Sequence, residues 1–146
     1  MDRNKLKRQL RMHEGLQLQV YEDSVGKLTI GVGRNLEDRG ITPDEAMYLL
    51  DNDITDFEAQ ISEAFPWYAD LDDVRQRVLV DMGFNLGLAG LKGFRRMLQA
   101  VQERRYDDAA TEMLASRWAE QVGQRARTLA EMMRSGQDPA PIDWIE

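Results

Sequence analysis

The sequence contains no cysteine and only one histidine, His13, among its 146 residues. The absence of cysteine excludes disulfides, thiolate nucleophiles, iron–sulfur clusters and every cysteine-based zinc site. A single histidine excludes the two-histidine zinc helix of metalloproteases, and Ser–His–Asp catalysis would have to run through that one residue. Carboxylates are therefore the expected catalytic groups, and the sequence gives no reason to expect a metal or an organic cofactor.

The sequence also lacks a long hydrophobic run. Its most apolar stretch, 78–94, is interrupted by Asp81, Asn85 and Lys92, whereas a membrane span needs about 20 apolar residues. The N-terminal segment is basic but has no apolar core of the kind found in secretory signals. We therefore expect no stable membrane insertion, and a protein that is made and kept in the cytoplasm unless another factor releases it.

Hydrophobic residues make up 42% and charged residues 31% of the chain, which is typical of one globular domain of about 150 residues. The net charge is −7, and residues 37–73 hold twelve acidic residues against one base, Arg39. This acidic segment is either a solvated helix face or a binding surface for a cationic partner. The negative sign disfavours a nucleic-acid-binding function for the domain.

The spacing of apolar residues predicts the secondary structure. Leu6 and Leu10 predict a short amphipathic helix over residues 3–13. Apolar residues then alternate over 15–20 and again over 28–33, on either side of a turn at 23–27, which predicts a β-hairpin.

The remainder of the chain is predicted to be helical. Thr42, Pro43 and Glu45 form a strong helix start, and one apolar face continues to Pro66, giving about 22 residues or roughly 33 Å. Further helices are predicted over 71–87, 93–102, 107–115 and 124–134. The predicted fold is thus α+β and mostly α. A small β-hairpin lobe, a long connecting helix and a helical C-terminal lobe would leave a cleft between the lobes.

Two carboxylates and a hydroxyl are predicted to meet beside the hairpin. Glu14 ends the first helix, Asp23 ends the first strand, and Thr29 lies on the returning strand. Glycoside hydrolysis needs one carboxylic acid to protonate the departing sugar oxygen and one carboxylate to activate water or attack the sugar carbon. Nearby leucines favour Glu14 as the acid, the polar turn favours Asp23 as the base, and Thr29 would hold the water. Each of the three residues also has a structural explanation without catalysis. A glutamate is common at a helix end, an aspartate in a turn and a threonine in a strand.

Residues 14–33 resemble the signature of the phage-type lysozymes, glycoside hydrolase family 24. The matching positions are Glu14, Gly15, Tyr21, Asp23, Gly26, Thr29, Ile30, Gly31 and Gly33. Other segments look like the family's interlobe helix, its central helix with the following turn, and its C-terminal helices: 41–46, 83–87 with 93–94, 104–110, 116–118 and 124–126. The resemblance therefore covers most of the chain.

The resemblance implies a single lysozyme domain over 1–146. Its lobes would be a small β-containing lobe with the interlobe helix at 12–65, and a helical lobe at 1–11 and 66–146. The implied reaction is inverting hydrolysis of the β-1,4 bond between N-acetylmuramic acid and N-acetylglucosamine in peptidoglycan, which causes host cell lysis. The implied partner is the glycan strand, bound by a monomer that needs a holin to leave the host cytoplasm.

The resemblance also implies roles for single residues. Glu14 is the general acid, Asp23 is the carboxylate on the opposite side, and Thr29 places the water. The candidate substrate-binding residues are Asn85, Arg125, Leu28 and Gly26. In the family, an amide side chain faces the cleft at the position of Asn85, and an arginine lies near the catalytic glutamate at the position of Arg125. Leu28 and Gly26 are hairpin positions.

The sequence departs from the family pattern in three respects. The segment after Gly33 is shorter than in the coliphage members, which removes part of the β-containing lobe. Arg34 stands where those members have histidine, so a local ion pair there would differ. The net charge of −7 also contrasts with the basic character of many members.

Other interpretations stay open at this stage. The pair Gly31 and Gly33 could begin a dinucleotide-binding loop, although the third glycine is missing. Residues 114–129 could form a helix-turn-helix that binds phosphates. The three tryptophans, Trp67, Trp118 and Trp144, belong either to the core or to sugar-stacking surfaces. The main alternative to an enzyme is a non-catalytic module with a lysozyme fold that binds peptidoglycan or builds a phage particle.

Overall fold

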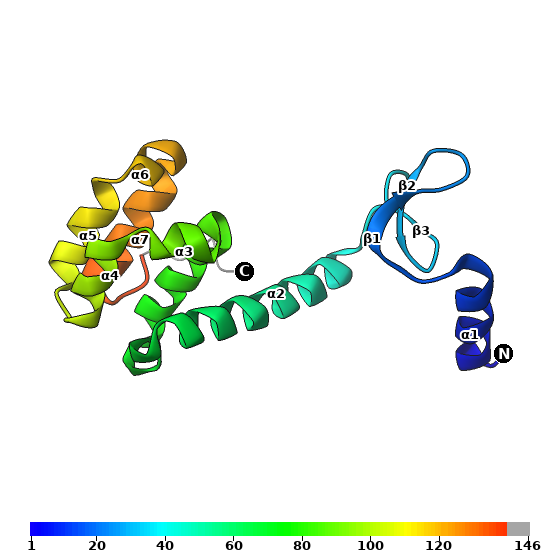
Figure 1. The fold of residues 1–146 in the computed structure, drawn as a ribbon, viewed down its shortest axis with the longest axis horizontal. Helices are drawn as coiled ribbons and strands as arrows, with labels where there is room; N and C mark the ends of the chain where they lie inside the picture. The colour runs from blue at the N-terminus through cyan, green and yellow to red at the C-terminus, as the bar shows by residue number, and fades with distance from the viewer. Residues whose placement is uncertain (140–146) are drawn as a thin grey trace. The chain divides into compact units, whose positions relative to one another are not determined.

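The computed structural model describes residues 1–139. The chain divides into two compact units, Met1–Leu50 and a part that begins at Asp51. Figure 1 labels the elements. The first unit contains α1 (Arg3–Glu14), β1 (Gln17–Glu22), β2 (Leu28–Gly31), β3 (Arg34–Asn35) and the first turns of α2 (Pro43–Ala64). The second contains the rest of α2, the 3-10 helix η1 (Pro66–Asp70), α3 (Asp73–Lys92), α4 (Arg95–Gln102), α5 (Tyr106–Leu114), α6 (Arg117–Val122) and α7 (Gln124–Ser135). The prediction of a mostly α protein with a small antiparallel sheet is confirmed.

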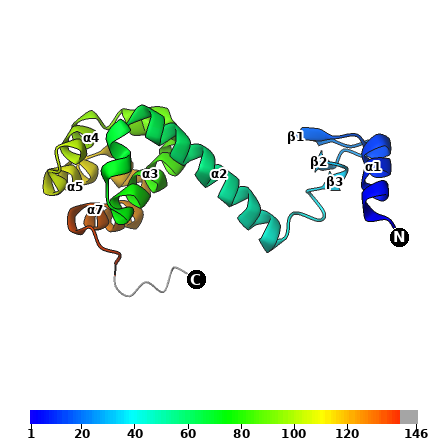
Figure 2. The same cartoon turned by 90° about the horizontal axis from the view of Figure 1, so that it is seen from below.

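The sheet has three antiparallel strands in the order β1, β2, β3, and Figure 2 shows it in the same unit as α1. Tyr21 pairs with Thr29 across β1 and β2, and Thr29 pairs with Asn35 across β2 and β3, so Thr29 lies on the central strand. The predicted hairpin is present. The predicted second strand, 28–33, is too long, because Gly31 and Gly33 have φ of 72° and 66° and turn the chain into β3. The glycine pair thus joins antiparallel strands, which removes the dinucleotide-loop interpretation.

The long helix begins as the sequence predicts. The backbone N–H of Glu45 donates to Thr42 Oγ1 at 3.1 Å, and the backbone N–H of Thr42 donates to Glu45 Oε1 at 2.9 Å. This reciprocal pair is a capping box, and it satisfies two backbone donors that a helix start leaves without partners. With 22 residues, α2 has the predicted length.

Arg34 connects β3 to the start of α2. Its two terminal guanidinium nitrogens donate to the two carboxylate oxygens of Glu45 at 2.9 and 2.6 Å, and one also donates to the carbonyl of Gly40 at 3.1 Å. These hydrogen bonds from Arg34, followed by that from the backbone of Thr42, lower the pKa of Glu45 to about 2. The residue that departs from the family pattern therefore makes a bidentate ion pair.

Replacing Glu45 with glutamine should make stability less dependent on pH in the acid range. The folded-state pKa of Glu45 is about 2 and its ordinary value is 4.5, so its stabilising contribution is present above about pH 4.5 and is lost as the pH falls toward 2. Glutamine keeps an acceptor for Thr42 but lacks the charge that faces Arg34. Urea unfolding measured from pH 7 to pH 3 should show that the wild type has a larger free energy of unfolding than Glu45→Gln, and that this difference becomes smaller as the pH falls. An advantage of constant size would contradict this assignment.

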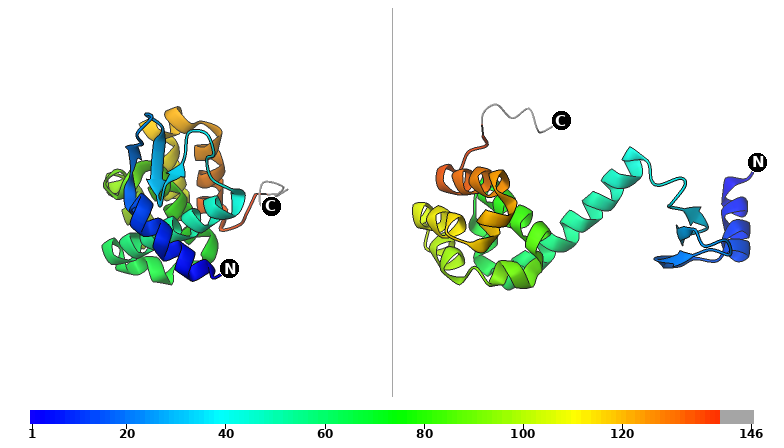
Figure 3. Two further views of the ribbon diagram at one scale, coloured as in Figure 1. Left: turned by 90° about the vertical axis from the view of Figure 1, so that its right-hand side faces the viewer. Right: turned by 90° about the horizontal axis from the view of Figure 1, so that it is seen from above.

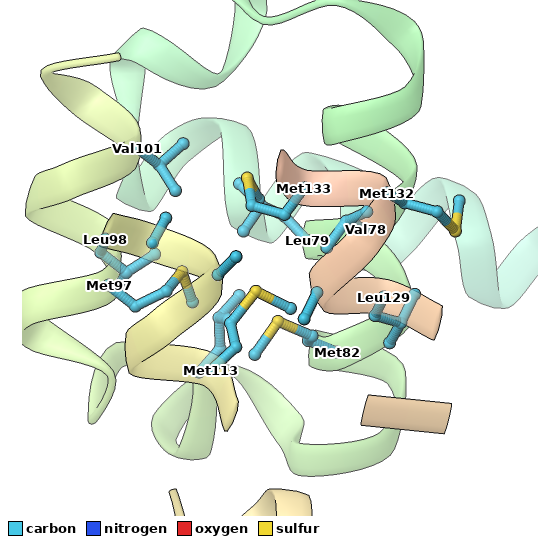
Figure 4. Close-up of a cluster of buried hydrophobic side chains, with 14 of the residues drawn as sticks. Val78, Leu79, Met82, Met97, Leu98, Val101, Met113, Leu129, Met132 and Met133 are labelled. Carbon is cyan, nitrogen blue, oxygen red and sulfur yellow. The ribbon is translucent and has the colours of Figure 1, made fainter. Parts of the chain in front are cut away.

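The hydrophobic core lies in the second unit. Helix α5 contacts α4 and α7, while α3 and α6 also contact α7. Figures 2 and 3 agree that α4, α5 and α7 lie together, and Figure 4 shows buried side chains between these helices. Five of the buried side chains are methionines: Met82, Met97, Met113, Met132 and Met133. Methionine is flexible and unbranched, so it fills the irregular gaps between short helices.

The structure adds detail to the predicted helices of this unit. The predicted helix end at Gly87 coincides with a break inside α3, because Gly87 is non-helical with φ of 77° and ψ of 164° and a short second helical segment follows it to Lys92. The spacing of apolar residues does not predict helix α6, although residues 116–118 resemble a C-terminal helix of the family. The N-cap of α6 is Ser116, whose hydroxyl accepts the backbone N–H of Ala119 at 3.1 Å. Because alanine replaces the acidic residue of a capping box at this position, the start signal in the sequence is weak.

The longest helices, α2 and α3, carry charged side chains along their length. The acidic residues that α2 exposes are Asp44, Asp51, Asp53, Asp56, Glu58 and Glu63. Their exposure agrees with a solvated acidic segment, and a surface for a cationic partner stays a prediction. No helix within residues 1–139 combines the length and the hydrophobicity needed to cross a membrane.

Candidate active site

Asp23 lies at the end of β1, where its carboxylate and its backbone both shape the turn to β2. Its Oδ1 accepts the backbone N–H groups of Val25 at 2.9 Å and Lys27 at 2.8 Å. Its backbone N–H donates to the carbonyl of Lys27 at 2.9 Å, and its carbonyl accepts the N–H of Gly26 at 3.0 Å. No residue in 1–139 donates a hydrogen bond to Oδ2. One oxygen of Asp23 is thus fixed by the turn, and the other is left for water or substrate.

Thr29 is 3% exposed and is the buried polar residue of the described chain. Its hydroxyl donates to the carbonyl of Lys27 at 2.8 Å, the same carbonyl that accepts the backbone N–H of Asp23. Asp23 and Thr29 therefore share one acceptor and are held together through it. Because the only proton of the hydroxyl is used, Thr29 can act toward a water molecule only as an acceptor.

Glu14 is the last residue of α1, and its carboxylate lies against Gly33 in the turn between β2 and β3. A methyl group built on Gly33 would lie 2.9 Å from Glu14 Oε2 and 3.2 Å from its Cδ. Glycine at position 33, where φ is also positive, thus leaves the space that the carboxylate occupies. Glu14 is exposed, and so are the leucines near it in the sequence: Leu10, Leu16 and Leu18 are 42%, 41% and 76% exposed.

Replacing Gly33 with alanine should displace the Glu14 carboxylate. The added methyl would meet the end of a flexible side chain, which moves more readily than backbone, so the fold should survive at a cost of about 1 kcal/mol for the positive φ. A misplacement of about 1 Å at a catalytic group can lower activity by up to about a hundredfold. Because the resemblance implies that Glu14 is the general acid, we expect at least about a tenfold loss of kcat with KM nearly unchanged. Alanine at Gly40, which also has positive φ but open space around it, is the matched control.

Gly26 and Leu28 flank Lys27 at the surface beside Asp23. Gly26 has open space around it and Leu28 is 42% exposed. The amine of Lys27 lies 3.3 Å from the carboxylate of Asp38, an ion pair that holds this side of the turn. Both candidate substrate-binding residues of the hairpin are thus accessible next to the carboxylate.

Asn85 and Arg125 lie in the second unit. Asn85 Oδ1 accepts the indole N–H of Trp118 at 2.8 Å, and Trp118 is 4% exposed with its ring perpendicular to that of Phe94. Because indole is only a donor, this contact fixes the amide orientation of Asn85 and directs its NH2 group away from Trp118. Arg125 donates to the carboxylate of Asp81 at 2.6 and 2.9 Å. The sequence did not predict either contact, because Trp118 is 33 positions from Asn85 and Asp81 is 44 positions from Arg125.

The three tryptophans have different environments. Trp118 belongs to the core, Trp67 is half-buried and lines an open pocket, and Trp144 lies outside the described residues. Within residues 1–139, no three side chains of the metal-binding types come together as a metal site.

Comparison with known proteins relates the whole arrangement to one family. Residues 11–135 match the family model described as "Phage lysozyme". Two proteins of Dictyostelium discoideum, "Probable T4-type lysozyme 1" and "Probable T4-type lysozyme 2", are each 26% identical over 161 aligned residues, covering 90% of this chain and 94% of the relative.

A third relative has a different kind of name. The "Pre-baseplate central spike protein Gp5" of Enterobacteria phage T4 is 27% identical over 155 aligned residues. The match covers 87% of this chain but only 27% of that protein. A segment similar to nearly the whole of this chain therefore occurs within a much longer phage protein.

Proposed function

The chain belongs to the phage lysozyme family, and from that premise we propose that it hydrolyses the β-1,4 bond between N-acetylmuramic acid and N-acetylglucosamine in bacterial peptidoglycan. Family membership and the two T4-type relatives support a lysozyme-type function. The observation that carries the specific reaction is the linked pair of Asp23 and Thr29, which leaves one carboxylate oxygen and one hydroxyl acceptor unused beside the turn.

Asp23 and Thr29 are suited to activating water. The free Oδ2 of Asp23 would accept one proton of the attacking water, and the hydroxyl oxygen of Thr29 would accept the other. These two hydrogen bonds would orient a lone pair of the water toward the anomeric carbon. Water attack opposite the departing oxygen inverts the configuration, so we propose an inverting mechanism.

Glu14 would be the general acid. Protonation of the glycosidic oxygen makes the departing sugar a neutral alcohol instead of an alkoxide, which lowers the barrier to bond cleavage. The Glu14 carboxylate lies against Gly33 at the turn between β2 and β3, where the missing side chain leaves room for it. Asn85 would donate its free NH2 group to the substrate, while Gly26, Leu28 and Arg125 would provide further contacts.

We also propose a biological setting. The protein would act as a monomer in host cell lysis, reaching the wall from the host cytoplasm through a holin. This setting follows from the family resemblance. It is testable by expression with and without a holin, because only the combination should lyse the cells.

The second candidate is a non-catalytic module with a lysozyme fold. The match to part of a phage spike protein favours it, because a segment of this kind occurs there within a longer protein. Such a module would bind peptidoglycan or build a particle without cleaving glycan. The intact set of Glu14, Asp23 and Thr29 favours the enzyme.

Incubation with purified sacculi separates the two candidates. The enzyme should release reducing ends, and mass spectrometry of the products should find N-acetylmuramic acid at the new reducing terminus. Folded protein that sediments with sacculi but releases no reducing ends would establish the non-catalytic module.

A further inference from the structure

The open pocket beside Trp67 has a volume of about 610 Å³, lies in the second unit and contains no residue of the proposed catalytic group. It is formed by the residues around η1, the end of α3 and the length of α4. Its volume is in the range of small-ligand sites. The residues on which its chemistry depends are Phe65, Trp67, Lys92, Arg95, Gln99 and Gln102.

Aromatic side chains form one part of the pocket. The rings of Phe65 and Trp67 are 5.3 Å apart between centroids and tilted by 32°. Both side chains are half-buried and pack against the core, so they are held while still lining the pocket. No acceptor for the indole N–H of Trp67 is present in residues 1–139, in contrast to Trp118, whose N–H is bound to Asn85. Trp67 thus offers an apolar ring and a donor that no described residue uses.

The charged side chains give this pocket a positive balance. Lys92 and Arg95 are exposed, and no carboxylate in the described part of the chain pairs with either. The single acid of the pocket, Glu103, already accepts hydrogen bonds from Arg105 at 3.0 Å and from Gln99 at 3.3 Å. Two cations therefore have no ion-pair partner, in a protein whose net charge is −7.

We propose that this pocket is a second glycan-binding site, which holds a peptidoglycan strand through residues other than those of the proposed catalytic group. A sugar ring has apolar C–H faces and polar edges, which match a tryptophan ring beside the amides of Gln99 and Gln102. The peptide stems of peptidoglycan carry carboxylates, which match Lys92 and Arg95. The inference rests on the proposed function for the identity of the polymer.

Indole NMR signals test the site directly. The protein has three tryptophans, so the ¹⁵N spectrum contains three indole signals, and Trp67→Phe identifies that of Trp67. The probes are a neutral N-acetylglucosamine tetramer and a disaccharide tetrapeptide prepared from sacculi, each added to Glu14→Gln protein. We expect both probes to shift the Trp67 signal saturably. Lys92→Glu should weaken only the charged probe, about three- to fivefold, and added salt should narrow that difference.

Sedimentation with sacculi extends the test to the polymer. In the Glu14→Gln background, Trp67→Ala should raise the apparent Kd at least about tenfold, and Lys92→Glu should raise it by a smaller factor. Lys5→Glu makes the same charge change on α1, outside the pocket, and serves as the control. If Trp67→Ala does not fold, Lys92→Glu still decides the matter because Lys92 is exposed.

Two results would overturn the inference. One is a Trp67 signal that stays unchanged with both probes at millimolar concentration, and the other is sedimentation that falls equally for Lys92→Glu and Lys5→Glu. The hydrolase proposal is tested by a separate measurement: it would be wrong if folded wild-type protein released no reducing ends from sacculi.

Discussion

Replacing Glu14 with glutamine should lower the rate of reducing-end release from purified sacculi by at least about a hundredfold. Glutamine preserves the size of the side chain and its position against Gly33, but its amide cannot donate a proton to the glycosidic oxygen. The loss should appear in kcat, with sedimentation of the protein on sacculi unchanged, since the proton is needed in the transition state and not for binding.

The matched control for this change is Glu22→Gln. Glu22 is exposed on β1 next to Asp23, and the substitution makes the same change of charge without a proposed role in the reaction. It should retain wild-type activity. Activity of Glu14→Gln within a few fold of wild type would remove Glu14 as the acid, even if the family assignment stands.

Asp23 calls for a different variant, because one of its oxygens builds the turn. Asparagine can keep that oxygen as the acceptor for Val25 and Lys27 while removing the charge. Loss of activity in a variant with a wild-type unfolding curve would therefore separate the role of Asp23 in the reaction from its role in the turn.

Local sequence signals predicted much of the fold. The capping box of Thr42 and Glu45 and the hairpin turn at Asp23 involve residues at most four positions apart, so their hydrogen bonds are encoded locally. The same holds for the length of α2, which follows from one start signal and one apolar face. Strand β3 was missed because it has only two residues, too few for an alternating pattern.

The features that sequence could not predict depend on distant residues. The motif names Gly33, but only the structure shows that Gly33 is needed because the Glu14 carboxylate occupies the space of its missing side chain. Trp118 was equally ambiguous from the sequence, as a core residue or a sugar-stacking surface, and its exposed fraction of 4% in the structure identifies it as a core residue. The positive charge of the Trp67 pocket likewise depends on which basic side chains form ion pairs with acidic ones in the folded structure. The amino-acid composition does not show these pairings.

Replacing Arg75 with leucine should destabilise the protein by about 3 kcal/mol. Its side chain is 13% exposed and lies near the start of α3. The guanidinium donates to the carbonyls of Met133 at 2.7 Å and Arg134 at 3.0 Å, and lies 3.5 Å above the ring of Tyr106. Arg75 thus caps the C-terminal end of α7 while joining α3 to α5.

The size of this effect follows from what the substitution leaves behind. Two carbonyls at the end of α7 would lose a charged donor, and each hydrogen bond from a charged group contributes about 1.5–3 kcal/mol. Lysine should rescue little, because an ammonium cannot reproduce the planar donor arrangement or the stacking on Tyr106. Arg134→Leu is the control: it removes an exposed ion pair with Glu131, and such pairs contribute at most about 1 kcal/mol. Urea unfolding followed by circular dichroism measures all three.

Gly136 provides an independent check on the same contact. It follows α7 with φ of 69°, and a methyl group there would lie 2.8 Å from a guanidinium nitrogen of Arg75. Gly136→Ala in the wild type should therefore cost both the backbone strain of about 1 kcal/mol and the displacement of Arg75. In the Arg75→Leu background only the strain should remain, so the two substitutions should be less than additive. Full additivity would mean that the guanidinium does not hold α7, and the cap would have to be assigned elsewhere.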